Sequence, residues 1–168
     1  MLMAFWRGLR PISRAILLLG GGLLLILMVL VGFALWDLDV FGSGQEDVDA
    51  AALEKLTGLT LPASASGLRS HVESWQDTII HLRFELPSAD LAAWQNSQTW
   101  DTPPAASPLS YPFETSPEWM ARQDWWQPQQ ATSFQVGTLR SALGHYQHVL
   151  IDSSDPARTL IYIVSFDT

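Results

Sequence analysis

The hydrophobic pattern of this chain is dominated by one uninterrupted apolar run, Ala15 to Trp36, which contains no charged and no amide side chain. A helix rises 1.5 Å per residue, so this run would reach about 33 Å, enough to cross a hydrocarbon core of roughly 30 Å. The apolar residues that follow are spaced in short alternations, which are typical of strands. The pattern predicts one transmembrane helix at 15–36 and a separate folded domain after it.

The charges on either side of the run predict its orientation. Three of the nine basic residues precede it, whereas all 17 acidic residues follow it. Positive residues are retained in the cytoplasm, so we expect a cytoplasmic basic tail at 1–14 and a domain that is periplasmic or extracellular. This layout is typical of a bacterial single-pass protein of the plasma (inner) membrane. The residues expected at the membrane interface are Trp6, Arg7, Arg10, Arg14 and Trp36.

The alternative is a secretory signal that is removed from the mature protein. Gly32-Phe33-Ala34 places small residues at the spacing that a signal peptidase accepts. The apolar stretch of a signal is typically about 7 to 15 residues long, which is shorter than this run. The sequence therefore favours an uncleaved anchor, whereas the alternative predicts a mature protein that lacks residues 1–34.

A juxtamembrane stalk is predicted at 37–58. Its beginning, FGSGQEDVD, is acidic and contains glycine and serine, as flexible spacers do. The following residues, 47–56, favour a short helix that Gly58 would end. A second break, LPASASG, is built from proline, serine and glycine. We therefore place the folded domain at 59–168.

Alternation of apolar and polar residues over 67–86 predicts a β-hairpin, with the apolar residues of its second strand at even positions from 80 to 86. Joining the apolar faces of both strands requires pairs such as Ser70 with Ile80 and Val72 with Thr78, since a one-residue slip would turn the charged face inward. His71, His81 and Arg83 would then face outward.

A short helix is expected after Pro87, with Ser88 as its N-cap and an end near Ser97. Leu91 and Trp94 would face the sheet. The next segment, 97–128, holds six of the ten prolines and six aromatic residues; we call it the aromatic segment. Long loops of this kind are uncommon in compact domains and are usually functional or ordered by their own side chains.

A closing hairpin is predicted from 147–152 and 159–166, joined by turn-forming residues at 153–158. The last strand, LIYIVSF, is apolar on both faces until Ser165, so both faces have to be covered. One helix covers one face, and the aromatic segment is the available cover for the other. The predicted fold is an α+β domain of order β-β-α-long loop-β-β, with a four-stranded antiparallel sheet, after one transmembrane helix.

Aromatic side chains supply the candidate contact site. Such side chains stack on sugars, peptides or cofactor rings, and they also cover exposed sheet faces. Because the last strand needs cover, the sequence favours packing for most of them, and one exposed tryptophan would be enough to mark a contact site. The candidate ligand or partner contacts are Tyr111, Phe113, Trp119, Trp125 and Trp126.

Histidines and carboxylates give weaker candidates. His71 and His81 would lie diagonally on one outward face, within reach of a shared metal, with His145 and His148 as further ligands. The chain has no HExxH motif and no histidine-rich tract, so the sequence favours solvated histidines and no metal. The carboxylate pairs Asp152 with Asp155 and Glu118 with Asp124 fit turn and loop roles better than acid–base catalysis.

Composition limits the function further. The chain has no cysteine, which excludes disulfides, thiol catalysis and cysteine-bound metals. From residue 37 onward, six basic and 17 acidic residues give a formal net charge of −11, which repels nucleic acid. No nucleophile, phosphate-binding or dinucleotide motif is present, so no enzyme and no cofactor is predicted.

These features favour a non-catalytic, membrane-anchored accessory or scaffolding subunit of a membrane complex, whose partners are the lipid bilayer and other membrane-protein subunits. The alternative is an anchored extracytoplasmic binding module for a small ligand or glycan, using the aromatic loop 100–126.

Overall fold

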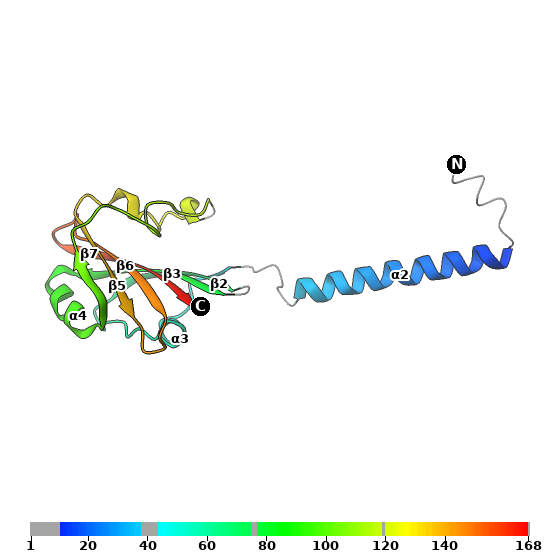
Figure 1. Ribbon diagram of the computed structural model, residues 1–168, viewed down its shortest axis with the longest axis horizontal. Coiled ribbons are helices and arrows are strands. Elements are labelled where there is room, and N and C mark those ends of the chain that lie inside the picture. The colour runs from blue at the N-terminus through cyan, green and yellow to red at the C-terminus, as the bar shows by residue number, and fades with distance from the viewer. Residues whose placement is uncertain (1–10, 38–43, 75–76, 119, 168) are drawn as a thin grey trace. The chain divides into compact units, whose positions relative to one another are not determined.

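A computed structural model describes residues 11–37, 44–74, 77–118 and 120–167 (Figure 1). The chain divides into two compact units, Met1–Gly42 and Ser43–Thr168. The first unit contains the helix α2, Pro11–Asp37, which includes the whole predicted run 15–36. Within α2 the structure describes the side chains of residues 19–32 only. These are exposed, with values that range from 76 % for Leu19 to 49 % for Val31 among the large apolar residues.

Among the described residues, no helix is both long enough and apolar enough to cross a membrane.

The second unit is an α+β domain built on one seven-stranded antiparallel sheet in which the strand order is β1-β2-β3-β7-β6-β5-β4. The α+β class predicted from the sequence is therefore confirmed. The strands are β1 (Gln45–Glu46), β2 (Ser66–Ser74), β3 (Thr78–Pro87), β4 (Trp100–Ala105), β5 (Phe134–Arg140), β6 (Tyr146–Asp152) and β7 (Arg158–Asp167). The helices are α3 (Ala50–Thr57) and α4 (Leu91–Ser97), with 3-10 turns η1 (Ser88–Asp90), η2 (Met120–Arg122) and η3 (Pro128–Gln130).

The sheet is wider than the four strands that the sequence predicted, because β1, β4 and β5 join it. β4 lies inside the aromatic segment and contains Pro103 and Pro104, which cannot donate to a ladder. Proline is tolerated there because β4 is an edge strand that pairs with β5 alone. β5 itself alternates only weakly, and Gly137 interrupts it. Propensity and periodicity therefore conceal these strands, which are defined by their neighbours.

The predicted hairpins are both present, with one change of register. In the first, His71 lies opposite His81 and Val72 opposite Ile80, so the pairing is shifted by two residues from the predicted one. An even shift leaves every side chain on its predicted face because side chains alternate with a period of two. The last pair is Ser74 with Thr78.

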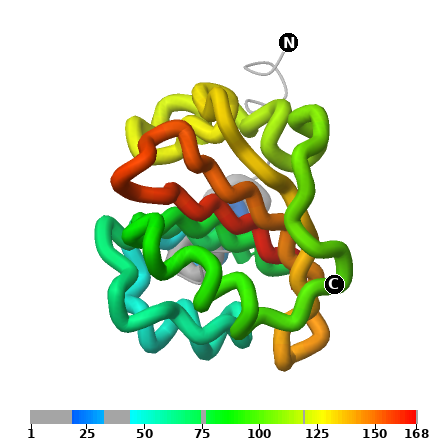
Figure 2. The backbone as a smooth tube through the Cα atoms, turned by 90° about the vertical axis from the view of Figure 1, so that its left-hand side faces the viewer, coloured from blue at the N-terminus to red at the C-terminus, as the bar shows by residue number. Residues whose placement is uncertain are grey.

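The last strand β7 is covered on both faces, as its sequence predicts. Ile161 and Ile163 lie in a first core, which also includes Leu53 of α3 and Trp94 of α4. On the opposite face of the sheet, Tyr162 belongs to a second core. Figure 2 shows this layering, with the yellow aromatic segment on one side of the orange and red strands and the cyan and green elements on the other. The aromatic segment and the strands supply the other buried members of the second core: Phe113, Met120, Trp125, Trp126, Leu150 and Val164.

The predicted stalk at 37–58 is wrong in its second half, because α3 belongs to the domain. Leu53 of α3 is fully buried in the first core, and Gln147 Nε2 donates a 2.7 Å hydrogen bond to the carbonyl oxygen of Thr57. The helix ends as expected, at Gly58, which has a φ of 67°. At its other end Asp49, which the sequence analysis did not single out, caps it by accepting from the Ala52 amide.

The approach to α3 is also attached to the sheet. A Cβ atom on Gly44 would lie 2.0 Å from the His71 ring, so the chain passes directly against that imidazole. The next residues form β1 on the edge of β2, and the Asp47 amide donates to the Ser70 carbonyl oxygen.

The helix that follows Pro87 begins differently from the prediction, since Ser88 forms part of η1 and makes no capping hydrogen bond.

We expect Trp126→Ala to lower the free energy of unfolding by about 3 to 5 kcal/mol, the usual effect of emptying a buried tryptophan site. The ring is 2 % exposed and packs edge-on against His81 and Tyr162. Tyr111→Ala, at a position that is 62 % exposed, should cost less than about 1 kcal/mol. Urea unfolding of the full chain in detergent micelles, followed by near-ultraviolet circular dichroism, measures both. Equal losses for the two variants would contradict a second core.

Candidate binding site

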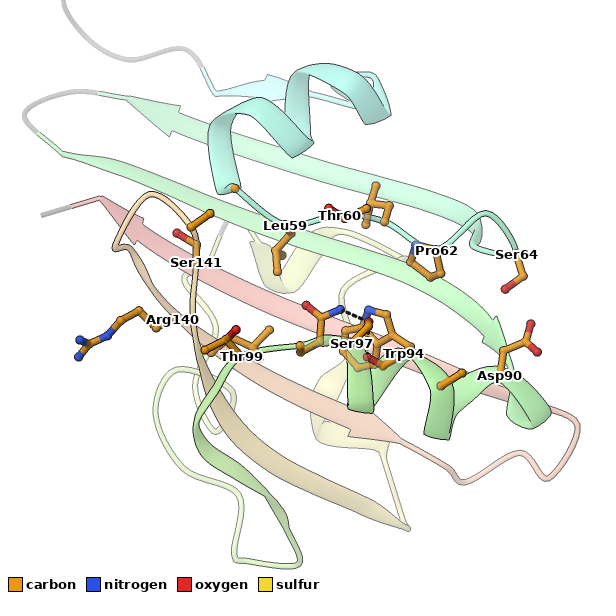
Figure 3. Close-up of a pocket in the computed structure, with 16 residues that line it drawn as sticks. Leu59, Thr60, Pro62, Ser64, Asp90, Trp94, Ser97, Thr99, Arg140 and Ser141 are labelled. Atoms are coloured by element: carbon orange, nitrogen blue, oxygen red, sulfur yellow. Dashed lines mark hydrogen bonds between the residues drawn. The ribbon is translucent and has the colours of Figure 1, made fainter.

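A groove with a volume of about 790 Å³ lies on the first-core side of the domain, and we call it the α4 groove (Figure 3). Three segments that are distant in the sequence enclose it. They are the connection 58–64 after α3, the stretch 90–99 that contains α4, and the residues 139–142 at the end of β5. The sequence offered no signal for this site, because none of the three segments carries a motif and only the sheet brings them together.

The floor of the α4 groove is apolar and part of the core. Leu59, Trp94 and Leu139 line it and are at most 7 % exposed. Trp94 packs edge-on against Phe84 and Trp100, and the Trp100 Nε1 group donates a 2.8 Å bond to the Gln95 carbonyl oxygen. Because these contacts fix α4 against the sheet, the floor is preformed.

Small polar side chains line the rim of the groove. Ser97 Oγ donates to the Trp94 carbonyl oxygen, and Gln98 Nε2 donates to Ser97 Oγ, the contact dashed in Figure 3. The guanidinium of Arg140 points away from the groove and bonds the Tyr146 hydroxyl, which leaves Asp90 as the charged side chain of the lining. The remaining rim residues are Thr60, Ser64, Thr99 and Ser141. An apolar floor with a hydroxyl rim is suited to binding an uncharged ligand or peptide segment.

Most of the predicted aromatic contacts serve the second core. Phe113, Trp125 and Trp126 are 2 to 6 % exposed, so a ligand cannot reach their ring faces in this structure. Tyr111 is exposed and lines a smaller pocket of about 220 Å³ on the opposite side of the sheet from the α4 groove. Trp119 lies outside the described residues.

The predicted membrane-interface residues are also beyond structural description. Trp6, Arg7 and Arg10 lie outside the described residues, and the side chains of Arg14 and Trp36 are not described within α2.

The predicted solvated histidine face is wrong, since His71 and His81 are 7 % and 6 % exposed. The aromatic segment covers this face, and the Trp126 ring lies 5.1 Å from that of His81. Burial, and to a lesser degree the neighbouring His71, lower the pKa of His81 from 6.5 to about 4. Its imidazole is therefore neutral at physiological pH.

The histidines considered as metal ligands, His71 and His81, are not joined by His145 and His148. Glu46 and Glu73 carboxylates lie 3.8 and 3.7 Å from the His71 nitrogens. His145 lies instead 3.2 Å from Asp167, and His148 lines the smaller pocket. Across the part of the chain that is described, no group of three or more histidine, aspartate or glutamate side chains is placed to hold a metal ion.

The carboxylates singled out in the sequence have local partners. Asp152 accepts from the Ser154 amide, and Asp155 accepts from the Ala157 amide, a bond that lowers the pKa of Asp155. These are the turn roles that the sequence favoured. Glu118 forms an ion pair with Arg122 one helical turn away, and Asp124 is exposed.

The low pKa of His81 predicts a loss of stability in acid. Below pH 6.5 the unfolded chain protonates this histidine, whereas the folded chain keeps it neutral until about pH 4. The free energy of unfolding should therefore fall by roughly 3 kcal/mol between these values, at 1.36 kcal/mol per pKa unit. Urea titrations of the full chain at several pH values measure the slope. His81→Gln should flatten it over this window, and an unchanged slope in that variant would contradict the assignment.

A fold supports many activities, so the function of this domain has to be argued from its particular side chains. No protein-family model, no curated protein and no solved structure matches this chain.

Proposed function

We propose that this protein is a non-catalytic, single-pass membrane protein that serves as an accessory or scaffolding subunit of a membrane complex. Its amino terminus would lie in the cytoplasm and its acidic domain outside. Support for the anchor comes from the sequence, since the apolar run 15–36, which lies within α2, would reach about 33 Å as a helix. Its described side chains are apolar and exposed, which favours a surrounding of lipid or other helices over water.

The observation that carries the scaffolding role is the α4 groove. Its volume of about 790 Å³ falls in the range of about 300 to 1,000 Å³ that is common for binding sites. The buried floor offers apolar surface to the side chains of a partner segment, and the rim hydroxyls offer hydrogen bonds to its backbone. Docking would therefore use this groove, and not Trp125 or Trp126 of the aromatic segment, because both are buried.

A second candidate function is the binding of a small ligand or glycan by the loop 100–126. One observation favours it, the exposed ring of Tyr111 beside the smaller pocket. This site lies on the other face of the sheet, so the two functions do not exclude each other.

The absence of cysteine makes the proposed topology directly testable. Single cysteines introduced by Met3→Cys and Ala106→Cys give two otherwise thiol-free chains. In intact cells, a membrane-impermeant maleimide should label the Ala106→Cys chain and leave the Met3→Cys chain unlabelled until the cells are lysed. Labelling of both or of neither in intact cells would contradict the orientation. Mass analysis of the purified chain gives a separate check of cleavage, since an anchor retains residues 1–34.

Two neighbouring alanines of α4 provide a matched test of the groove. Ala93 and Ala92 are both exposed, but Ala93 lines the groove and Ala92 does not. A photo-crosslinking residue at position 93 should capture one defined partner subunit in membranes, whereas the same residue at position 92 should not. Ala93→Trp should reduce co-purification of that subunit at least tenfold by filling the groove, and Ala92→Trp should leave it unchanged. Equal capture from the two positions would reject the groove as the docking surface.

A further inference from the structure

Tyr111 is an exposed aromatic ring that the fold holds firmly in place. Its ring is 62 % exposed, although the next two residues, Pro112 and Phe113, are buried. The amides of Phe113 and Glu114 both donate to the Ser110 carbonyl oxygen, at 2.8 and 3.1 Å, and so fix the turn that carries the ring. An exposed aromatic side chain with a restrained backbone is typical of a contact residue, because little conformational entropy is lost on binding.

Two further rings support Tyr111 from the sheet. Phe166 stacks with it, with ring centroids 6.1 Å apart and an angle of 23° between the planes. The ring of His148 lies 6.2 Å away, nearly perpendicular to it. We call these three rings the platform, and two of them, Tyr111 and His148, line the smaller pocket.

The pocket beside this platform holds about 220 Å³ and lies between β4, β5 and the turn at Tyr111. Gly137 shapes it, because a Cβ atom there would lie 2.7 Å from the Thr102 carbonyl oxygen. The backbone of β4 can therefore approach β5 closely and close one side. Four hydroxyl-bearing side chains and one imidazole are among the residues that line the pocket: Thr102, Ser107, Ser110, Thr138 and His148.

Every side chain that lines this pocket is uncharged at neutral pH. None is acidic or basic apart from His148, and burial lowers the pKa of His148 below its ordinary value of 6.5. A neutral imidazole has one nitrogen that donates and one that accepts, and each hydroxyl can do both. An anionic ligand would also meet the repulsion of the second unit, Ser43–Thr168, whose six basic and 15 acidic residues give a formal net charge of −9.

We infer that this pocket binds one neutral sugar ring of a glycan. A pyranose has an apolar face of C–H groups, which fits the tyrosine ring, and hydroxyl groups at its edge, which fit the hydroxyls and the imidazole of the lining. The volume of about 220 Å³ is below the range for larger organic ligands, so it accommodates a single ring.

The proline ring of a partner peptide is the competing ligand, since it also stacks on tyrosine. Proline offers no hydroxyl groups, so its binding would remove water from the polar lining without replacing the lost hydrogen bonds. The lining therefore favours the sugar.

The expected affinity is low. So small a ligand binds with a dissociation constant of the order of 1 mM. Many copies of the domain on one membrane facing a polymeric glycan would raise the effective affinity by multivalency. This site does not depend on the α4 groove, because the two lie on opposite faces of the sheet.

Saturation-transfer NMR on the full chain in lipid nanodiscs tests the inference, with detergents that carry sugar headgroups kept out. The probes are maltotriose, cellotriose and N-acetylchitotriose, and triproline serves as the competing ligand. At least one trisaccharide should receive saturation, concentrated on one ring. Tyr111→Ala should weaken its binding at least tenfold, whereas Tyr111→Phe should bind within about twofold of the wild type.

Tyr146→Ala is the matched control, because Tyr146 is an exposed tyrosine on β6 that does not line the pocket. This variant should bind as the wild type does. The groove variant Ala93→Trp should also leave sugar binding unchanged, so a failure of the scaffolding proposal is distinguishable from a failure of this one. The inference is overturned if no trisaccharide binds, if Tyr111→Ala binds as well as the wild type, or if triproline alone binds through Tyr111.

Discussion

The structure of this domain depends on one strand that is apolar on both faces. Ile161 and Ile163 of β7 point into the first core, and Tyr162 and Val164 point into the second. Because neither face can be left in water without losing most of the hydrophobic stabilisation, the chain must supply two covers. It uses α3 and α4 for one face and the aromatic segment for the other. This division explains why an irregular, proline-rich segment packs against the sheet, and why its Trp125 and Trp126 are buried.

Both candidate sites arise where these covers meet the sheet. The α4 groove lies where α4, the connection after α3 and the end of β5 come together without closing completely. The smaller pocket, which Tyr111 lines, lies where the aromatic segment leaves the second core and the backbone of β4 approaches Gly137 of β5 closely. Loops and short helices supply most of the lining of the α4 groove, whereas the strands β4, β5 and β6 supply most of the lining of the smaller pocket.

The buried histidines illustrate how a correct pattern can still give an incorrect environment. Alternation placed His71 and His81 on the face opposite to Ile80, and the pairing in the structure keeps them there. That face is not solvated, because Trp126 and the rest of the aromatic segment cover it. Alternation reports which side chains share a face, but only the tertiary structure reports what lies against it. The same reason accounts for α3, because its end at Gly58 was predicted from the sequence, whereas its burial against the sheet was not.

The sequence by itself determined the apolar run at 15–36, both hairpins, the faces of their strands and the need to cover β7 twice. These follow from periodicity and from local capping or turn chemistry, which act over a few residues. The tertiary structure alone decided that β1, β4 and β5 widen the sheet, that α3 belongs to the domain, and where the α4 groove and the smaller pocket lie. Each of these depends on contacts between residues far apart in the chain, such as Thr57 with Gln147 or Gly137 with Thr102. Such contacts leave no local pattern, because any residue of suitable size and polarity satisfies them once the sheet brings the segments together.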